Sequence, residues 1–353
     1  MKKTIYTMML ATALTGGQAL ADSAYTVVEE ALGYDAPYLI ARTYKNIDQL
    51  DGIEGMTLTI RAPEQSEIGR NLSEYKVIAA YRQAIDSRLG TKTGDVKNNS
   101  LVMKGGAVNR LWGAATYARL SVADGNSVVM TGGTVFDSVV GGYSENSGAS
   151  QNAVYLVGKG GKATIRGVEY TGSDAGIQIK GAVQVGECYG SNSVGNALDI
   201  YGTDISIGSI DTAFTQLINF HLADARLTSE YAPMITLTNA PLDLTGFLIP
   251  TDDNPTPAQA LTFDALGSLE YKPGTSVTLV SDALGITIDE SLLNKEYNIY
   301  SHGHPETIVG TGKIELEQNN TILKLTVQGV PEPATGTLSL LALAGLCMRK
   351  HRK

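Results

Sequence analysis

Short runs in which apolar residues alternate with polar or small ones recur along the middle of the chain. Residues 99–108 read Asn-Ser-Leu-Val-Met-Lys-Gly-Gly-Ala-Val, and residues 126–135, 27 positions later, read Asn-Ser-Val-Val-Met-Thr-Gly-Gly-Thr-Val. After one extra residue, Leu111–Ala114 matches Val139–Gly142, and a third, weaker copy begins at Asn152. Alternation with a period of two is typical of a β-strand, and a Gly-Gly pair supplies the positive φ that a sharp corner requires. The repeat therefore predicts short strands joined by glycine turns.

Farther along, the repeating unit shortens. Alternating segments contain Ile177, Leu198, Ile218 and Ile235, which lie 21, 20 and 17 positions apart. Short strands at a regular period, without helical segments between them, predict a parallel β-solenoid over residues 99–250. An antiparallel sandwich is the alternative, with strands at roughly 8–12-residue spacing. We favour the solenoid because the copies resemble one another in sequence and not only in spacing.

A helix is predicted over residues 71–89, because its apolar positions follow three- and four-residue steps. These positions are Leu72, Tyr75, Ile78, Ala79, Arg82 (through its aliphatic stem), Ile85 and Leu89. Asn71 is a suitable N-cap and Gly90 follows the last turn. We expect this helix, within an N-terminal cap region of residues 22–98, to cover the first open coil.

Residues 251–257 read Thr-Asp-Asp-Asn-Pro-Thr-Pro, which predicts a solvated loop and a domain boundary. Further β structure is predicted over residues 251–330, with Gln318–Asn320 as the turn of a final hairpin. We expect this region to cap the far end, where the last coil would otherwise expose an unpaired edge.

The first 21 residues have the pattern of a secretory signal peptide. Lys2 and Lys3 form a charged start, and residues 5–14 are apolar. Ala19 and Ala21 give the small-x-small cleavage pattern, so the mature chain is predicted to begin at Asp22.

The last 23 residues have three parts in a fixed order. Pro331, Glu332 and Pro333 come first, and the apolar run 334–348 follows. A basic end then closes the chain, formed around His351 by Arg349, Lys350, Arg352 and Lys353. An apolar run of 15 residues is shorter than the roughly 20 that span a bilayer, but bilayer thinning tolerates such a helix. The basic end is expected to stay cytoplasmic.

This tail resembles the PEP-CTERM sorting signal of diderm bacteria, which an exosortase-type membrane protease reads. The resemblance implies membrane attachment before processing, recognition near Pro331–Pro333, and delivery to the cell envelope, cell surface or extracellular matrix. The glycine-rich repeats also resemble, in composition, the passenger regions of autotransporter-like surface proteins.

The charge of the interior limits its partners. The two end segments hold six Lys/Arg residues and one Glu, which leaves 21 basic and 35 acidic residues between them. This excess of acidic residues repels the phosphate backbones of nucleic acids. We therefore expect no nucleic-acid binding. Of two cysteines, Cys347 lies in the tail, which leaves Cys188 without an intrachain disulfide partner and predicts a buried filler.

Candidate catalytic and metal-binding residues are few. Asp252 and Asp253 would be an acid pair for glycoside hydrolysis, but adjacent residues in a Pro-rich loop favour solvation. His302 and His304, with His221, form the main candidate metal or proton-transfer set, but no patterned carboxylates accompany them. The clustered Asp, His, Arg and Lys residues of pectin-degrading β-helices are not apparent. We therefore predict no catalytic residues, metal site or cofactor.

Trp112 and Tyr143 lie near predicted turns, where exposed rings would stack on sugars and buried rings would fill corners. We expect a non-enzymatic surface or matrix protein that acts as a stalk, adhesin or structural component. A glycan-active or glycan-binding β-helix is the alternative, with polysaccharide as its partner.

Overall fold

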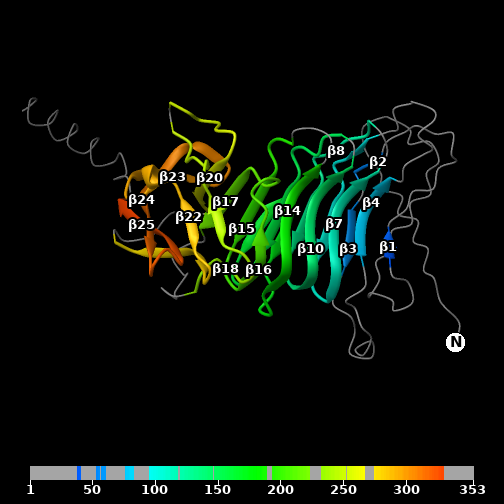
Figure 1. The fold of residues 1–353 in the computed structure, drawn as a ribbon, viewed down its shortest axis with the longest axis horizontal. Helices are drawn as coiled ribbons and strands as arrows, with labels where there is room; N and C mark the ends of the chain where they lie inside the picture. The colour runs from blue at the N-terminus through cyan, green and yellow to red at the C-terminus, as the bar shows by residue number, and fades with distance from the viewer. Residues whose placement is uncertain are drawn as a thin grey trace, which may run out of the picture.

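The computed structural model describes residues 38–40, 53–55, 57–60, 76–82, 95–117, 120–145, 147–188, 193–222, 232–251, 253–266 and 274–329. These residues are nearly all β, and 18 strands join one large, mostly parallel sheet. The strands are stacked along the long axis of the molecule, from β1 (Tyr38–Ile40) to β24 (His304–Glu317) and β25 (Ile322–Gly329), as Figure 1 shows. The one helical segment in the described ranges is the 3-10 turn η4 (Glu290–Leu292).

The parallel strands form two ladders, and along the chain the strands belong alternately to one ladder and to the other. The first ladder consists of β1, β4 (Lys76–Arg82), β7 (Ala107–Thr116), β10 (Gly133–Ser144), β14 (Ile177–Cys188), β16 (Ile205–Ile210), β18 (Ile235–Leu237) and β21 (Ser276–Asp282). The second ladder consists of β3 (Thr57–Ile60), β6 (Ser100–Met103), β9 (Ser127–Met130), β11 (Ala153–Val157), β15 (Ala197–Tyr201), β17 (Leu217–Leu222), β20 (Ala260–Ala265) and β23 (Glu296–Ser301).

Smaller groups of strands border the ladders. The strands β2 (Ile53–Glu54), β5 (Val96–Lys97) and β8 (Ala123–Asp124) are parallel neighbours, as are β19 (Leu242–Leu244) and β22 (Ile286–Ile288). An antiparallel hairpin, β12 (Lys162–Ile165) and β13 (Val168–Thr171), is inserted between β11 and β14.

The repeat seen in the sequence corresponds to strand register. Ser100 pairs with Ser127, and Leu111 with Val139, so the two copies lie on neighbouring strands. The third copy is confirmed as well, because Ser127 pairs with Ala153 on the next strand of the ladder.

The predicted shorter unit is wrong in part. Leu198 pairs with Ile218, but Ile177 lies on the first ladder and pairs with Ile205, which in turn pairs with Ile235. Strands of both ladders show the same alternation of apolar and polar residues. The predicted period therefore mixed strands that belong to two different ladders.

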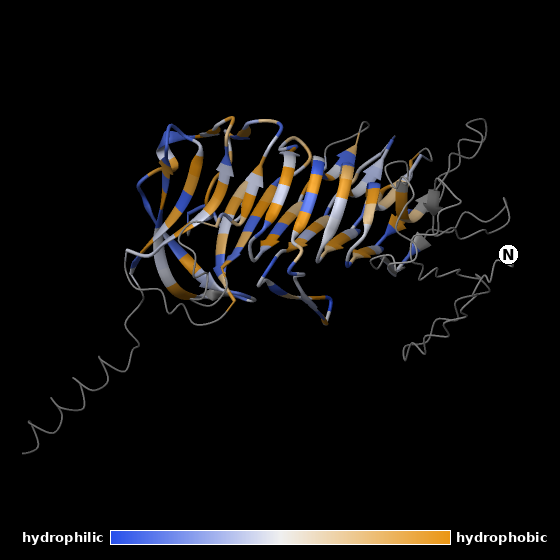
Figure 2. Cartoon of the chain, turned by 90° about the horizontal axis from the view of Figure 1, so that it is seen from below, coloured by the Kyte–Doolittle hydropathy of each residue, from blue (hydrophilic) through white to orange (hydrophobic). Residues whose placement is uncertain are grey.

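The core is a column of aliphatic side chains between the ladders. On the second ladder its members occupy successive register positions: Leu101, Val128, Val154, Leu198, Ile218 and Leu261. Each of them is at most 1% exposed, and burying one such side chain contributes about 1.5–3 kcal/mol. Figure 2 shows the resulting hydrophobic bands across neighbouring strands.

Four fully buried asparagines form a second column just before the strands of the second ladder: Asn99, Asn126, Asn152 and Asn196. The side-chain oxygen of Asn126 accepts the backbone N–H of Asn99 at 3.0 Å, and that of Asn152 accepts the N–H of Asn126 at 2.9 Å. Asn196 does the same for Asn152 at 3.0 Å, and Gln216 does so for Asn196 at 3.1 Å. We call these four residues the asparagine column.

The amide groups of this column also donate to buried carbonyls. The side chain of Asn126 donates to the Val96 carbonyl at 3.0 Å, and that of Asn152 to the Ala123 carbonyl at 2.8 Å. Asn196 repeats the bond to the Ala149 carbonyl at 2.9 Å. Backbone groups between the strands thus find partners without water.

Glycines have two different roles in these repeats. Gly106 and Gly133 have φ angles of 85° and 105° and turn corners, as predicted. Gly142 instead lies inside β10, where an added Cβ would overlap the amide of Asn152. Gly186, its neighbour in register on β14, makes room for Asn196 in the same way. These strand glycines therefore accommodate the asparagine column.

The predicted helix over residues 71–89 is wrong at its centre. Residues Lys76–Arg82 form strand β4, which pairs in parallel with β1 and β7. All four residues of the segment 77–80 are at most 2% exposed. A strand buried on both faces gives an unbroken apolar run, so its spacing resembled that of a helix. Residues 71–75 and 83–89 lie outside the described ranges.

Parallel pairing crosses both predicted domain boundaries, between residues 98 and 99 and between 250 and 251. Strands β3 and β6 pair across the first, and β17 and β20 across the second. The final hairpin turn is confirmed, since Gln318, Asn319 and Asn320 all have positive φ between β24 and β25. This hairpin pairs antiparallel with both β21 and β23, the last strands of the two ladders.

The two predicted targeting segments lie outside the described residues. This applies to Ala19, Ala21, Asp22, Pro331, Glu332, Pro333, Arg349, Lys350, Arg352 and Lys353. Within the described ranges, no helix has the length and apolar character needed to span a membrane.

Candidate functional site

Alternate residues of the second ladder point away from the core and form two outward columns. Strand register aligns Asp199 with Asn219 and then with Thr262 in one column. The other column aligns Tyr201 with His221 and then with Asp264. The intervening residues, such as Ile218 and Phe220, are buried in the core. Consecutive strands β15, β17 and β20 therefore present polar side chains at the same level.

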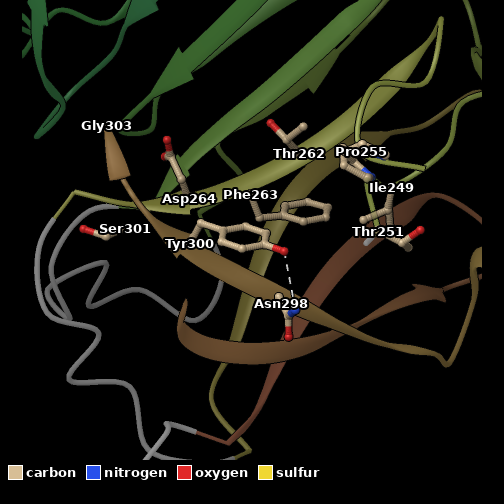
Figure 3. A pocket seen from close by; sticks show the side chains of 11 residues that line it. Ile249, Thr251, Pro255, Thr262, Phe263, Asp264, Asn298, Tyr300, Ser301 and Gly303 are labelled. Atoms are coloured by element: carbon tan, nitrogen blue, oxygen red, sulfur yellow. Dashed lines mark hydrogen bonds between the residues drawn. The ribbon is translucent and has the colours of Figure 1, made fainter. Parts of the chain in front are cut away.

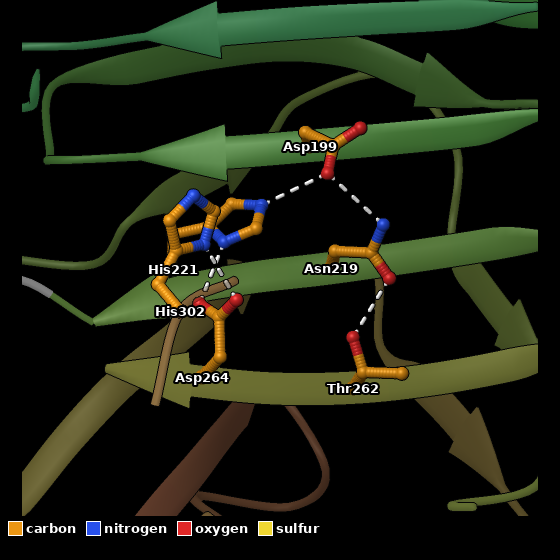
Figure 4. A network of polar contacts seen from close by, with 6 residues as sticks. All are labelled: Asp199, Asn219, His221, Thr262, Asp264 and His302. Carbon is orange, nitrogen blue, oxygen red and sulfur yellow. Dashed lines mark hydrogen bonds and ion pairs between the residues drawn. The ribbon is translucent and has the colours of Figure 1, made fainter. Parts of the chain in front are cut away.

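His221 lies between two carboxylates. Its Nε2 is 2.9 Å from Oδ1 of Asp199, and its Nδ1 is 2.6 Å from Oδ1 of Asp264. The other oxygen of Asp264, Oδ2, is 2.8 Å from Nδ1 of His302, which follows β23 (Figure 4). Only 6% of the His221 side chain is exposed, against 35% for His302. We call Asp199, His221, Asp264 and His302 the His–Asp cluster.

Further hydrogen bonds hold the cluster in place. Asn219 donates to Oδ1 of Asp199 at 3.0 Å, and Thr262 donates to the Asn219 side-chain oxygen at 2.7 Å. The ring of Tyr201 stacks on that of His221, with centroids 4.0 Å apart and planes at 12°. The imidazole is thus fixed in its plane and at both nitrogens.

The electrostatics of the cluster favour positive charge beside the carboxylates. Burial opposes the charged form of His221, but hydrogen bonds to Asp199 and Asp264 outweigh it and raise its pKa to about 9. Burial also opposes ionisation of Asp264, yet the two histidines hold the pKa of that carboxyl below its usual range. Burial, with the nearby carboxylates, raises the pKa of Tyr201.

A pocket of about 520 Å³ adjoins the cluster. Asp264 belongs to both, and Tyr300, Phe263 and Asn298 line the pocket beside it (Figure 3). Asn298 donates to the Tyr300 hydroxyl at 3.4 Å. Residues 249–251 and Pro255 form the opposite wall. The pocket combines a carboxylate, an amide and aromatic rings, which is a lining suited to a small polar ligand.

The structure brings together residues that the sequence left apart. His221 and His302 were candidates, but we expected no patterned carboxylates near them. This expectation is wrong, because Asp199 on β15 and Asp264 on β20 lie on the two strands that flank β17, the strand of His221. Their outward place in alternating strands was the available signal, but strand register was needed to align them. His304 takes no part in the His–Asp cluster.

The other candidates lie elsewhere. Trp112 and Tyr143 are only 5% and 8% exposed and stack on each other with centroids 5.1 Å apart. Of the two alternatives, this burial favours rings that fill corners over rings that stack on sugars. Asp253 is exposed, as expected of a solvated loop, whereas Asp252 lies outside the described residues. Cys188 is buried beside Ala123 and Ala149, as predicted.

Comparison with known proteins gives no family for this chain. No protein-family model, curated protein or solved structure matches it.

Proposed function

We propose that this chain is an exported surface or matrix protein of a diderm bacterium, with a β-solenoid body that acts as a stalk or structural component. The observation that carries the proposal is the unbroken parallel pairing of the second ladder from β3 to β23. Strands that pair on both sides, with a continuous apolar column beneath them, give a stiff, elongated body. Such a body supports display at a distance from the membrane.

Delivery is proposed to follow from the two ends of the chain. The signal peptide would direct export with cleavage after Ala21, and the tail would hold the protein in the membrane until exosortase acts near Pro331–Pro333. Loss of the apolar run and the basic end would then release the body to the envelope or extracellular polymer.

Mass spectrometry of the C-terminus of the surface-fraction protein tests this proposal. We expect the peptide that contains Arg349–Lys353 to be missing, and the Glu332→Ala variant to retain it. A Glu317→Ala variant, which changes an exposed acid of β24, should be processed normally. Mature protein that still ends at Lys353 would refute processing.

Glycan binding without turnover is a second candidate, favoured by the pocket beside the His–Asp cluster. Tyr300 offers an aromatic ring, and Asp264 and Asn298 offer partners for sugar hydroxyls. On a glycan array we expect the purified protein to bind and Tyr300→Ala to lower the signal at least tenfold. Tyr170→Ala, at a half-buried ring on β13 outside the pocket, should bind normally. Equal loss in both variants, or no binding by the unaltered protein, would refute a glycan site here.

A further inference from the structure

The hydrogen-bonding capacity of His221 does not match its surroundings. Both of its ring nitrogens face carboxylate oxygens, Asp199 on one side and Asp264 on the other. A neutral imidazole carries one N–H, and an ionised carboxylate only accepts. One of these two nitrogen–oxygen contacts therefore lacks a hydrogen in the neutral ring. It requires a positively charged group there, which is either a second proton on the ring or a metal ion.

We propose that His221, Asp264 and His302 bind a divalent transition-metal ion. One ligand atom from each of the three residues lies within 4.8 Å of the others. Ligand atoms around one tetrahedral zinc ion are about 3.3 Å apart, so the ion needs only a small adjustment of the three side chains. The 2.6 Å contact between Nδ1 of His221 and Oδ1 of Asp264 must lengthen, and His302 can move to complete the site because it sits at the β23–β24 turn and is one-third exposed.

The donor set defines the class of ion. Two imidazole nitrogens and one carboxylate oxygen are the ligands of open zinc sites and of non-haem iron sites. Mg²⁺ and Ca²⁺ prefer sets made up of oxygen atoms. A first-row ion such as Zn²⁺ is therefore the expected occupant, and the remaining coordination position is left for water or a ligand.

The groups around these residues are those that a metal site needs. If Nε2 of His221 donates to Asp199, the lone pair of Nδ1 is directed toward Asp264. Carboxylates that orient a metal-binding histidine in this way are a common feature of such sites. Asn219 donates to Asp199 in turn and fixes that carboxylate. Asp199 is thus a positioning residue and not itself a ligand.

Access to the site comes from the pocket. Asp264 lines the 520 Å³ pocket, and its side chain is 23% exposed. An ion can therefore enter from solvent without opening the stack of strands. The metal site does not depend on tail processing or on glycan binding, so its test is independent of the proposed function.

The experiment measures zinc binding by the full chain after chelator treatment and dialysis. We expect isothermal titration with Zn²⁺ to give one site per chain, elemental analysis after dialysis to give the same ratio, and Mg²⁺ or Ca²⁺ to give no binding. His302→Ala should weaken Zn²⁺ binding at least tenfold, while His304→Ala, which removes a histidine outside the cluster, should leave it unchanged. Asp199→Asn should weaken it by roughly 10- to 100-fold through the orientation of His221.

Two results would overturn the proposal. One is the absence of stoichiometric zinc, which would leave the second proton on His221 as the positive centre. The other is equal zinc binding by His302→Ala and His304→Ala, which would indicate adventitious binding by surface histidines. Circular dichroism of each variant checks that the fold is retained, and His302 is the variant of choice because it is the most exposed member of the cluster.

Discussion

At the scale of single residues, the asparagine column links the strands β6, β9, β11 and β15 of the second ladder. The side chains of Asn126, Asn152 and Asn196 each accept from a neighbouring N–H and donate to a carbonyl, so the two polar atoms of each serve two buried backbone groups. Leaving such groups without partners costs about 1–3 kcal/mol each. Gly142 and Gly186 provide the space that the amides occupy, so the choice of glycine inside these strands has a steric cause.

We expect Asn126→Ala to lower the free energy of unfolding by about 2–4 kcal/mol, because the Asn99 N–H and the Val96 carbonyl lose their side-chain partner. Urea denaturation followed by circular dichroism measures the change. Asn254→Ala is the control, since Asn254 is exposed and its loss should change the same quantity by no more than about 0.5 kcal/mol. Equal stability of the two variants would contradict the role assigned to the column.

At the scale of elements, the sequence predicted the strands best where whole copies repeat. The two copies that begin at Asn99 and Asn126 pair in register along their length, because repeated sequence produces repeated structure. Prediction failed at β4, whose residues 77–80 are buried on both faces and so lack alternation. It also failed for Ile177, because alternation alone does not tell one ladder from the other.

The His–Asp cluster was harder to predict than the strands. Asp199, His221 and Asp264 are separated by 22 and 43 positions, as different amounts of chain intervene between successive strands. No fixed period connects them, and only the register of β15, β17 and β20 aligns them. The sequence identified His221 and His302 as candidate metal-binding or proton-transfer residues, but their carboxylate partners could be identified only from the structure.

At the scale of the whole molecule, the stack of strands has an end that must be closed. The hairpin β24–β25 pairs with the last strand of each ladder, and it buries Ile314, Leu323, Leu325 and Val327 completely. Burial of four such side chains contributes roughly 6–12 kcal/mol, comparable to the whole stability of many domains. An edge strand left without its partner is also a template for pairing with another chain.

We therefore expect a chain of residues 22–301 to associate or aggregate, while a chain of residues 22–329 stays monomeric. Both chains keep every strand of the two ladders, but the shorter one lacks both hairpin strands and exposes the edges of β21 and β23. Size-exclusion chromatography with light scattering gives the mass of each, and thermal unfolding should begin at a lower temperature in the shorter chain. If residues 22–301 were monomeric and as stable as residues 22–329, the hairpin would not be the closing element. Closure would then have to come from the way β21 and β23 themselves end the ladders.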